Sequence, residues 1–516
     1  MAKALVAVIT FVAFLPALGN GFVAWDDDRN FLDNPHYRGL GPAQLAWMVS
    51  HLDAHYVPLT GLTLGLDYVL WGMNPAGYHL TSLVLHAANA VLVYAVARRL
   101  IAAALPGVSS IALALGSAVA ALLFAVHPLR VESVAWATER RDVLCGLFYL
   151  LTVLAYLRYC ASASRRWYRL SLAFLAAALL SKAMAVTLPV ILLLLDAYPL
   201  RRRAWREKLP FFALSLAAGA IALVAQRAAG ATSTVTFLGP LERVAIAGYS
   251  LAFYLWKTLV PRHLSPIYEL PARVDAFASS YVASALAVLA LSVLAIALRR
   301  RWPAFTVVWA SYVVTVLPVS GLVQVGPQIA ADRYTYLALL GVAILAGGAF
   351  VLVWRALEGR RAAALVARWA AAPVLGCGAL ALVIALAVLT IKQTQVWRNS
   401  ETLWTHALSV GPSAIAHAKL GVVRDEQGRP EEAIAHYRQA LRIHPDMPDA
   451  YNDWGIALAR QGRWLEAIEQ YENALKLAPG SVEAHANLAQ ALERVGRAAE
   501  AAEHTRAAQR TKRERR

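Results

Sequence analysis

Long apolar runs recur along the chain between Leu5 and Ile391. A helix needs about 20 mostly apolar residues to cross a bilayer, and many of these runs approach that length. Twelve candidate spans lie at residues 3–20, 77–103, 109–127, 143–160, 167–183, 184–199, 209–227, 243–261, 279–298, 303–322, 334–356 and 370–391. The pattern predicts an all-α, polytopic membrane helical bundle over residues 1–395.

A different pattern, with a period of 34 residues, begins at Ser413. That period is typical of tetratricopeptide repeats, in which two antiparallel helices pack small residues against each other. Equivalent positions hold Leu420-Gly421, Trp454-Gly455 and Leu488-Ala489; Ala433, Ala467 and Ala501; and Tyr437 and Tyr471. We therefore expect residues 396–516 to form a tetratricopeptide repeat solenoid, with a partial repeat near Trp404 followed by three repeats.

Composition supports this division of the chain. Hydrophobic residues make up 59% and charged residues 16% of the 516 residues, so most of the chain is expected in lipid. The net charge is +17, but the arginines fall in short clusters between apolar runs. The positive-inside rule accounts for such clusters. No basic surface interleaved with aromatic residues is apparent, which argues against nucleic-acid binding.

The same clusters predict an orientation. Lys3 and the lack of basic clusters in residues 21–76 place the N-terminus in the cytoplasm and the first long loop outside. The basic residues at 355–368 are then cytoplasmic, which sends the last span and the repeats outward. This arrangement needs an odd number of crossings, about 11. We expect the polar segment 243–261 to fail as a full span, with the 167–199 hairpin as the alternative.

Residues 3–18 resemble a signal peptide but lack a small-residue cleavage site, so we interpret them as a retained first helix. Cys145, Cys160 and Cys377 lack the spacing of a metal site or a disulfide framework. No phosphate-binding glycine loop, serine elbow or zinc spacing is present.

Three consecutive carboxylates, Asp26, Asp27 and Asp28, follow the first apolar run. Neighbouring like charges raise the pKa of one carboxylate, which suits a base that takes a hydroxyl proton. The residues are also oxygen ligands of the kind that Mg²⁺ or Mn²⁺ accepts, so the sequence leaves metal dependence open. A solvated acidic turn or a helix cap is the structural alternative.

Three other outer segments carry cations. Arginine forks fit phosphate oxygens, so these segments are candidates for holding a lipid-linked phosphate. The candidate phosphate-binding residues are Arg130, Arg141, Lys182 and Arg333, and the candidate supporting acids are Glu132, Glu139 and Asp332. The alternatives are an internally paired interfacial helix, a snorkelling lysine and a juxtamembrane anchor. His79 and His86 share a helix face, where packing or hydrogen bonding is the simpler role.

Several of these segments resemble the transmembrane and tetratricopeptide repeat-containing family, in its bacterial branch. The resemblance lies in residues 22–27, 58–60, 74–86, 127–136, 181–182 and 331–336, followed by the repeats. That family is similar to the protein O-mannosyltransferases with the membrane glycosyltransferase C fold. The resemblance implies an inverting transfer from a polyprenyl-phosphate sugar donor to a hydroxyl acceptor on the extracytoplasmic side of a bacterial inner membrane.

The mannosyltransferases' paired acidic motif maps by position onto Asp26 and Asp27. The resemblance therefore implies Asp26 as the base and Asp27 as its support, although the extra Asp28 allows the register to shift by one residue. The acceptor would be a protein or peptide hydroxyl presented by the repeats. Two other functions compete with this one. A membrane scaffold would recruit envelope partners through its repeats, and a transporter would need a polar route that residues 279–391 scarcely offer.

Overall fold

The computed structural model describes residues 1–52, 56–228, 238–323, 326–358 and 365–514 of the chain. It divides into two compact units, Met1–Arg398 and Asn399–Arg516. The predicted boundary at residue 395 lies close to this division. Each unit is described separately below.

The first unit is built almost entirely from helices, as predicted. Its α-helices are α1 (Ala2–Phe14), α2 (Pro42–Ser50), α3 (Pro58–Trp71), α4 (Pro75–Ala104), α5 (Ser110–Ala125), α6 (Val131–Ala135), α7 (Arg140–Ser162), α8 (Arg165–Ser181), α9 (Leu188–Ala197), α10 (Leu209–Ala228), α11 (Pro240–Leu259), α12 (Ser279–Leu298), α13 (Pro303–Val316), α14 (Thr335–Ala338), α15 (Leu340–Glu358) and α16 (Leu365–Val396). Two short strands, β1 (Tyr268–Glu269) and β2 (Gln328–Ala330), pair in antiparallel fashion.

Short turns of helix connect several of these elements and later position the site. They include a π-helical turn, Asp28–Leu32, and the 3₁₀ turns Pro128–Arg130, Ala137–Glu139, Ala183–Thr187 and Asp332–Tyr334. The predicted first loop, residues 21–76, is not irregular throughout, because it contains α2 and α3.

Seven helices of the described residues are long and apolar enough to cross a membrane, or eight if the bent pair Ser110–Ala125 and Pro128–Ala135 counts as one span. This is fewer than the predicted number of about 11. The helices α8, α9 and α13 are too short for this criterion, although the last two are apolar. The segment expected to fail, now α11, also lies outside the set. It carries Glu242, Arg243 and Lys257 within 20 residues.

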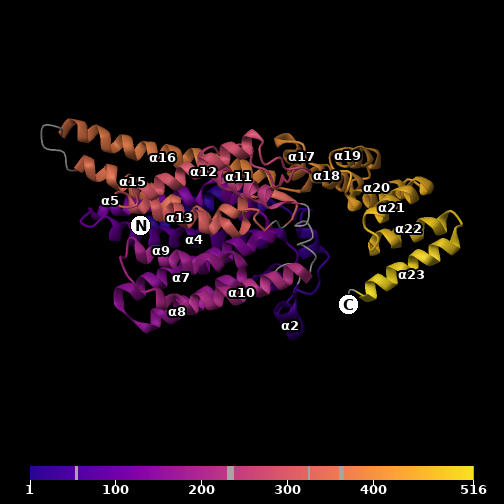
Figure 1. Ribbon diagram of the computed structural model, residues 1–516, viewed down its shortest axis with the longest axis horizontal. Helices are drawn as coiled ribbons and strands as arrows, with labels where there is room; N and C mark the ends of the chain where they lie inside the picture. Colours follow the sequence, from indigo (N-terminus) through magenta and orange to yellow (C-terminus); the bar gives the residue numbers. More distant parts are fainter. Residues whose placement is uncertain (53–55, 229–237, 324–325, 359–364, 515–516) are drawn as a thin grey trace. The chain divides into compact units, whose positions relative to one another are not determined.

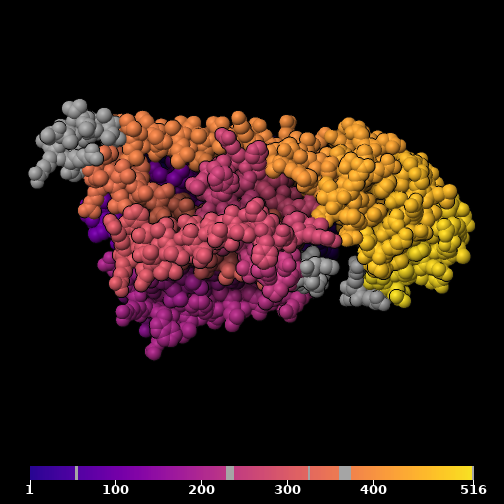
Figure 2. Space-filling view, turned by 45° about the horizontal axis from the view of Figure 1, so that its top comes forward, coloured from indigo at the N-terminus to yellow at the C-terminus, as the bar shows by residue number. Residues whose placement is uncertain are grey.

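Burial separates inner from outer helices in this unit. The most apolar stretch of the span that contains α7 is 61% buried and that of α4 is 50% buried, whereas that of α12 is only 11% buried. The first two therefore lie inside the bundle, and α12 presents most of its apolar surface outward. Figure 1 shows α7, α8 and α10 running side by side. In Figure 2, α11 to α13 lie between α15–α16 and α8–α10 on one face.

One close helix crossing depends on two glycines. A Cβ atom on Gly116 of α5 would lie 2.6 Å from the carbonyl oxygen of Gly347 in α15, and a Cβ on Gly347 would lie 2.3 Å from the oxygen of Gly116. The backbones can approach this closely only because neither residue has a side chain, as is common where membrane helices pack.

The second unit consists of successive antiparallel helix pairs (Figure 1). The single helix α17 (Ser400–Val410) comes first. It is followed by α18 (Ala414–Glu426), α19 (Pro430–Ile443), α20 (Pro448–Arg460), α21 (Trp464–Leu477), α22 (Val482–Arg494) and α23 (Ala498–Glu514). Helices α18 and α19, α20 and α21, and α22 and α23 pack as pairs. This arrangement of helix pairs is the one expected of tetratricopeptide repeats, and the division into a partial repeat and three repeats stays a prediction.

Glycine and tyrosine are matched within the first two repeats. A Cβ atom on Gly421 would lie 2.6 Å from the Tyr437 ring, and one on Gly455 would lie 2.5 Å from the Tyr471 ring. Each tyrosine is nearly fully buried. In the third repeat the equivalent positions hold Ala489, which is larger than glycine, and Thr505, which is smaller than tyrosine. The larger residue on the first helix thus accompanies a much smaller one on the second, which leaves room for the added methyl group.

Candidate active site

A cavity of about 850 Å³ opens in the first unit. Its walls come from segments far apart in the sequence: the loop after α1, helices α2 and α3, the turn before α7, the break after α8, and the segment around β2. Among the residues that line it are five of the predicted site residues, namely Asp26, Glu139, Arg141, Lys182 and Arg333. The fold therefore brings together three of the four predicted phosphate-binding cations and one of the three consecutive aspartates.

Glu139 joins the three cations. Its Oε1 accepts a hydrogen bond from Arg141 Nη2 at 2.6 Å, and its Oε2 accepts one from Lys182 Nζ at 2.8 Å. Arg333 Nε lies 3.4 Å from Oε1. The Glu139 side chain is fully buried, whereas the three cations are 10–12% exposed. The carboxylate thus holds the three cations close together, and part of each cation remains exposed at the cavity wall.

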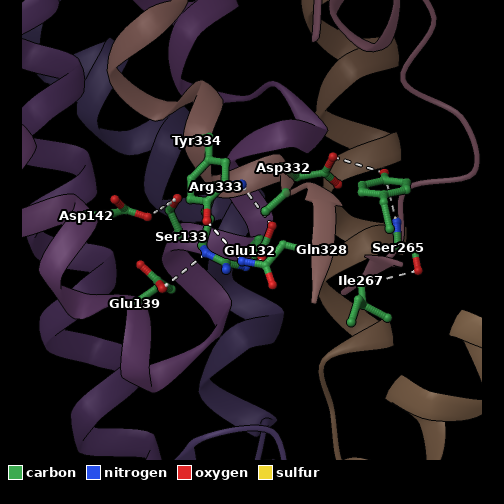
Figure 3. A network of polar contacts seen from close by, with 12 residues as sticks. Glu132, Ser133, Glu139, Asp142, Ser265, Ile267, Gln328, Asp332, Arg333 and Tyr334 are labelled. Atoms are coloured by element: carbon green, nitrogen blue, oxygen red, sulfur yellow. Dashed lines mark hydrogen bonds and ion pairs between the residues drawn. The ribbon is translucent and has the colours of Figure 1, made fainter. Parts of the chain in front are cut away.

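Two further acids, Glu132 and Asp142, pair with two of these cations. Arg333 Nη1 pairs with Glu132, whose Oε2 also accepts the Arg333 backbone N–H at 2.8 Å. Lys182 Nζ donates to Asp142 Oδ1 at 2.7 Å, and Ser133 donates to Asp142 Oδ2 at 3.0 Å. Figure 3 shows the Arg333 side chain lying between Glu132 and Glu139, with Ser133 and Asp142 beside them.

The fold places Lys182 at a break between helices. Helix α8 ends at Ser181, and Lys182 has an extended backbone with φ −161° and ψ 133° before the next 3₁₀ turn. Burial lowers the pKa of Lys182, but the carboxylates of Asp142 and Glu139 more than offset this effect and raise it above its ordinary value. The side chain is therefore a permanent cation at neutral pH.

Asp26 and Asp27 lie in different surroundings. Asp27 is completely buried and accepts three hydrogen bonds: from Val23 N–H at 2.9 Å, from Thr138 N–H at 3.1 Å and from the Thr138 hydroxyl at 2.6 Å. Burial raises the pKa of Asp27 to about 7, against these hydrogen bonds. The residue anchors the first loop to the turn before α7 and does not line the cavity.

Asp26 is partly buried and lines the cavity. Burial raises the pKa of Asp26 above its ordinary value, and the charges of Arg141 and Arg333 act in the opposite direction. Asp28 begins the π-helical turn, accepts a hydrogen bond from the Arg29 backbone N–H at 2.9 Å, and is absent from the cavity lining. The structure thus offers one of the three aspartates to a ligand in this cavity.

Arg130 and Asp332 lie outside the cavity lining. The Arg130 guanidinium is buried against aromatic rings, 5.1 Å from the centroid of Phe124 and 5.6 Å from that of Tyr336. Asp332 accepts a hydrogen bond from the Tyr268 hydroxyl at 3.0 Å. These contacts give both residues packing roles behind the site, so Arg130 does not join the other three predicted cations.

The two histidines of α4 are buried in the bundle. His86 is hydrogen bonded through Nδ1 to the Tyr336 hydroxyl at 2.8 Å and through Nε2 to the Ala125 carbonyl at 2.9 Å. His79 lies seven residues earlier on the same helix and is 1% exposed. For His86, the hydrogen-bonding role predicted from the sequence is the observed one.

Sequence reasoning missed the aromatic wall of the cavity. The His36 ring stacks on Trp47 with centroids 5.6 Å apart, and Trp47 stacks on His51 at 4.7 Å. All three line the cavity together with Trp25. Trp47 and His51 are four residues apart, a spacing that would have placed them on one helix face, had a helix been expected in this loop.

A buried ion pair beneath the site was also missed. Arg140 Nη2 lies 2.7 Å from Asp67 Oδ2, and both side chains are almost fully buried. Arg140 also donates to the Tyr78 carbonyl at 2.5 Å and to Ser82 Oγ at 2.8 Å. Because α3 and α4 supply these partners, the pair fixes the start of α7, and with it Glu139 and Arg141.

The three aspartates do not form a shared metal site. Both oxygens of Asp27 are used on Val23 and Thr138. In the part of the chain that the structure describes, no group of three or more histidine, cysteine or carboxylate side chains is placed to hold a metal ion. The cavity lining instead includes the Asp26 carboxylate, which can take a proton, together with Arg141, Lys182 and Arg333, which can hold an anion. Asp33, Glu139 and Arg29 also line the cavity.

Comparison with known proteins agrees with both units. Residues 421–462 match the family described as TPR repeat, and residues 452–514 match the tetratricopeptide repeat family. The chain is 26% identical to the protein O-mannosyl-transferase Tmtc1 of Drosophila melanogaster, over 86% of this chain and 62% of that protein. It is also 26% identical to the human protein O-mannosyl-transferase TMTC1, over 88% of this chain and 56% of that protein.

The chain spans less than two thirds of the length of these two relatives. Among solved structures, ArnT from Cupriavidus metallidurans bound to undecaprenyl phosphate aligns with 93% of this chain and 80% of its own, at 14% identity and a TM-score of 0.33. The homologues confirm the resemblance that the loop segments indicated.

Proposed function

We propose that this chain, a homologue of the Tmtc protein O-mannosyl-transferases, transfers a sugar from a polyprenyl-phosphate-linked donor to a hydroxyl acceptor on the extracytoplasmic side of the membrane. Mannose is the first sugar to test, and a protein serine or threonine the first acceptor. The observation that supports this most strongly is that Asp26 shares one cavity with Arg141, Lys182 and Arg333.

The proposed reaction uses Asp26 as a general base. The acceptor oxygen attacks the anomeric carbon of the sugar, while its proton passes to the Asp26 carboxylate. The bond between the anomeric carbon and the phosphate oxygen breaks, and its electron pair stays on the phosphate. Attack from the face opposite the leaving group inverts the configuration at the anomeric carbon.

The three cations stabilise the leaving phosphate in this proposal. Bond cleavage adds a negative charge to the phosphate, and fixed cations aimed at a developing charge lower the barrier most effectively. Arg141 and Arg333 provide forked N–H donors, and Lys182 provides a point charge. Glu139 keeps them close together despite their mutual repulsion. The presence of these three cations side by side is the reason for assigning the phosphate to this wall of the cavity.

The repeat unit suits recognition of the acceptor. Stacked helix pairs form extended surfaces that bind peptide segments in many repeat proteins. We assign the acceptor polypeptide to this unit and the sugar donor to the first unit. The competing scaffold function needs the repeats but has no use for a base and three cations around a cavity.

Sugar transfer by the purified full-length chain tests the proposal directly. The assay supplies polyprenyl-phosphate mannose and a peptide that contains serine and threonine, and it measures release of polyprenyl phosphate and glycosylation of the peptide. Asp26→Asn should reduce turnover by at least about a hundredfold, the lower range for loss of a general base. Asp28→Asn is the matched control, because that neighbouring carboxylate does not line the cavity. Equal turnover by Asp26→Asn and the wild type would contradict the assignment, and a wild type inert toward every polyprenyl-phosphate sugar would favour the scaffold.

A further inference from the structure

A second cavity, of about 740 Å³, lies between the start of α1, the last turns of α4 and the start of α5. Its polar lining residues are Lys3, Tyr94, Arg98 and Arg99, and its other lining residues are Met1, Ala2, Ala95, Ala102, Leu113 and Ala114. No acidic residue is among these lining residues. The cavity therefore combines several positive charges with a floor of small apolar side chains.

The two cavities lie at opposite ends of α4. Near its beginning, the Tyr78 hydroxyl is 3.1 Å from that of Tyr37, which lines the first cavity. Arg98 lies 20 residues later on the same helix, and at 1.5 Å per residue this is about 30 Å, the thickness of the hydrocarbon core of a bilayer. The second cavity is thus placed at the headgroup level of the leaflet opposite to the first.

The arginines of the second cavity are hydrogen bonded to neutral groups of the protein. Arg98 donates to the Tyr94 hydroxyl at 3.3 Å and Arg99 to the Ala95 carbonyl at 3.3 Å, both neutral acceptors. Within the described residues, neither guanidinium is paired with a carboxylate. Glu358 is engaged by Ser109 and Trp354 and does not line this cavity.

Further features of the cavity favour an anion. Arg158 of α7 adds a like charge that acts on Arg99. The first N–H groups of α1 have no partner within the helix and point toward its start, where Lys3 lies. A phosphate group would satisfy these donors and relieve the repulsion among the arginines.

We propose that this cavity binds the phosphodiester headgroup of an anionic phospholipid from the leaflet opposite to the first cavity. Free phosphate has the same charge chemistry, but the alanine and leucine side chains of the floor would be left exposed beside it. A lipid covers them with the first carbons of its acyl chains. This proposal does not rest on the proposed transferase function.

The simplest competing explanation is that Arg98 and Arg99 only help to set the orientation of the protein in the membrane. Arg299 and Arg300 provide the matched control, because they form a second adjacent pair at the end of a membrane helix and line neither cavity. If the cavity is a specific site, lipid binding depends on Arg98 and Arg99 and does not depend on Arg299 and Arg300. General attraction between basic residues and an anionic surface requires both pairs equally.

Lipid binding to the delipidated full-length chain tests the proposal. Titrations in detergent use phosphatidylglycerol, phosphatidylcholine and inorganic phosphate, followed by native mass spectrometry and by thermal unfolding. Phosphatidylglycerol should bind and raise the unfolding temperature, with little effect from the other two. Arg98→Gln/Arg99→Gln should bind it about thirtyfold more weakly, and Arg299→Gln/Arg300→Gln should bind it like the wild type.

Lys3→Gln gives an independent variant, in an exposed residue whose loss does not threaten folding. It should weaken phosphatidylglycerol binding about fivefold. Equal losses in the two double variants, or no loss in Lys3→Gln and Arg98→Gln/Arg99→Gln, would overturn the proposal. Binding of inorganic phosphate as tight as that of phosphatidylglycerol would reassign the cavity to a soluble anion.

Discussion

The Glu139 carboxylate and the Lys182 ammonium, 43 residues apart in the sequence, form an ion pair of 2.8 Å at the wall of the larger cavity. The pair joins the turn before α7 to the break after α8. Because Glu139 is also bonded to Arg141 and lies near Arg333, one buried carboxylate determines the spacing of three cations. Its removal should therefore have effects beyond the loss of one contact.

Glu139→Gln should destabilise the first unit by about 3–5 kcal/mol, because breaking a buried ion pair leaves charges uncompensated. Thermal unfolding of the full-length chain in detergent measures the effect. Glu483→Gln, at an exposed residue of α22, is the control and should unfold like the wild type. An unchanged unfolding temperature in Glu139→Gln would show that the cations are held close together without this carboxylate.

Lys182→Met should raise the KM for the sugar donor about tenfold or more, because a charged hydrogen bond to phosphate contributes about 1.5–3 kcal/mol. Lys182→Arg retains the charge and should recover most of the affinity. Steady-state kinetics with varied donor concentration separates KM from kcat. Lys392→Met, an exposed lysine outside the cavity, is the control. A Lys182→Met enzyme with both normal KM and normal kcat would remove this lysine from the phosphate site.

The pH dependence of kcat/KM should follow the ionisation of Asp26. A general base acts only when deprotonated, so the rate should fall as pH decreases through the pKa of Asp26, which burial raises above the ordinary value of 3.8. Arg141 lowers this pKa. Arg141→Gln should therefore move the acidic limb of the profile to higher pH. A shift to lower pH, or none, would indicate that another group controls the limb.

Asp27→Asn should disturb the site through the backbone. Both carboxylate oxygens accept hydrogen bonds, so an amide would place an NH₂ group against an N–H donor of Val23 or Thr138. We expect a loss of about 1–3 kcal/mol in unfolding free energy, the cost of a buried unsatisfied group. Chemical denaturation measures it. Thr138→Val, which removes only the hydroxyl donor, should cost less, and the reverse order would contradict the anchoring role.

Gly455→Ala should loosen the second repeat. The new methyl group would lie 2.5 Å from the ring of Tyr471, and overpacking of this kind costs about 1–3 kcal/mol. Hydrogen exchange of peptides from α20 and α21 in the full-length chain reports the change. Gly455→Ala/Tyr471→Thr reproduces the residue pair of the third repeat and should recover part of the protection. Gly480→Ala is the control, because its new methyl group would lie 4.0 Å from Thr511 Cγ2, an ordinary contact distance.

The fold class could be predicted from the sequence because it depends on the pattern of apolar runs. Most of the charged residues of the cavity could be predicted because they lie in loops assigned to one side of the membrane. Apolar runs reveal helices, and Asp26, Arg141, Lys182 and Arg333 all lie between runs that the orientation assigned to one face. Arg130 belongs to the same loop, yet its guanidinium turns toward Phe124. A five-residue helix and one short 3₁₀ turn separate it from Arg141. Segments this short have no periodic pattern from which the direction of a side chain could be predicted.

The number of spans and the aromatic wall were harder to predict, for different reasons. Helices such as α9 and α13 are apolar but short, so hydropathy alone does not show whether they cross the membrane. The wall depends on α2, only nine residues long, inside a segment that lacks a long apolar run. The Trp47–His51 stack and the Asp67–Arg140 pair cannot be predicted before the positions of α2, α3 and α7 are known.

The matched glycine and tyrosine of each of the first two repeats limit how such a chain can be recombined. A crossover between the two helices of a repeat would join Gly455 to a threonine, which leaves a void, or Ala489 to a tyrosine, which produces a clash. A crossover between whole repeats transfers both residues together. Duplication or shuffling of this arm, in evolution or in the laboratory, is therefore expected to preserve packing when the joint falls after the second helix of a repeat.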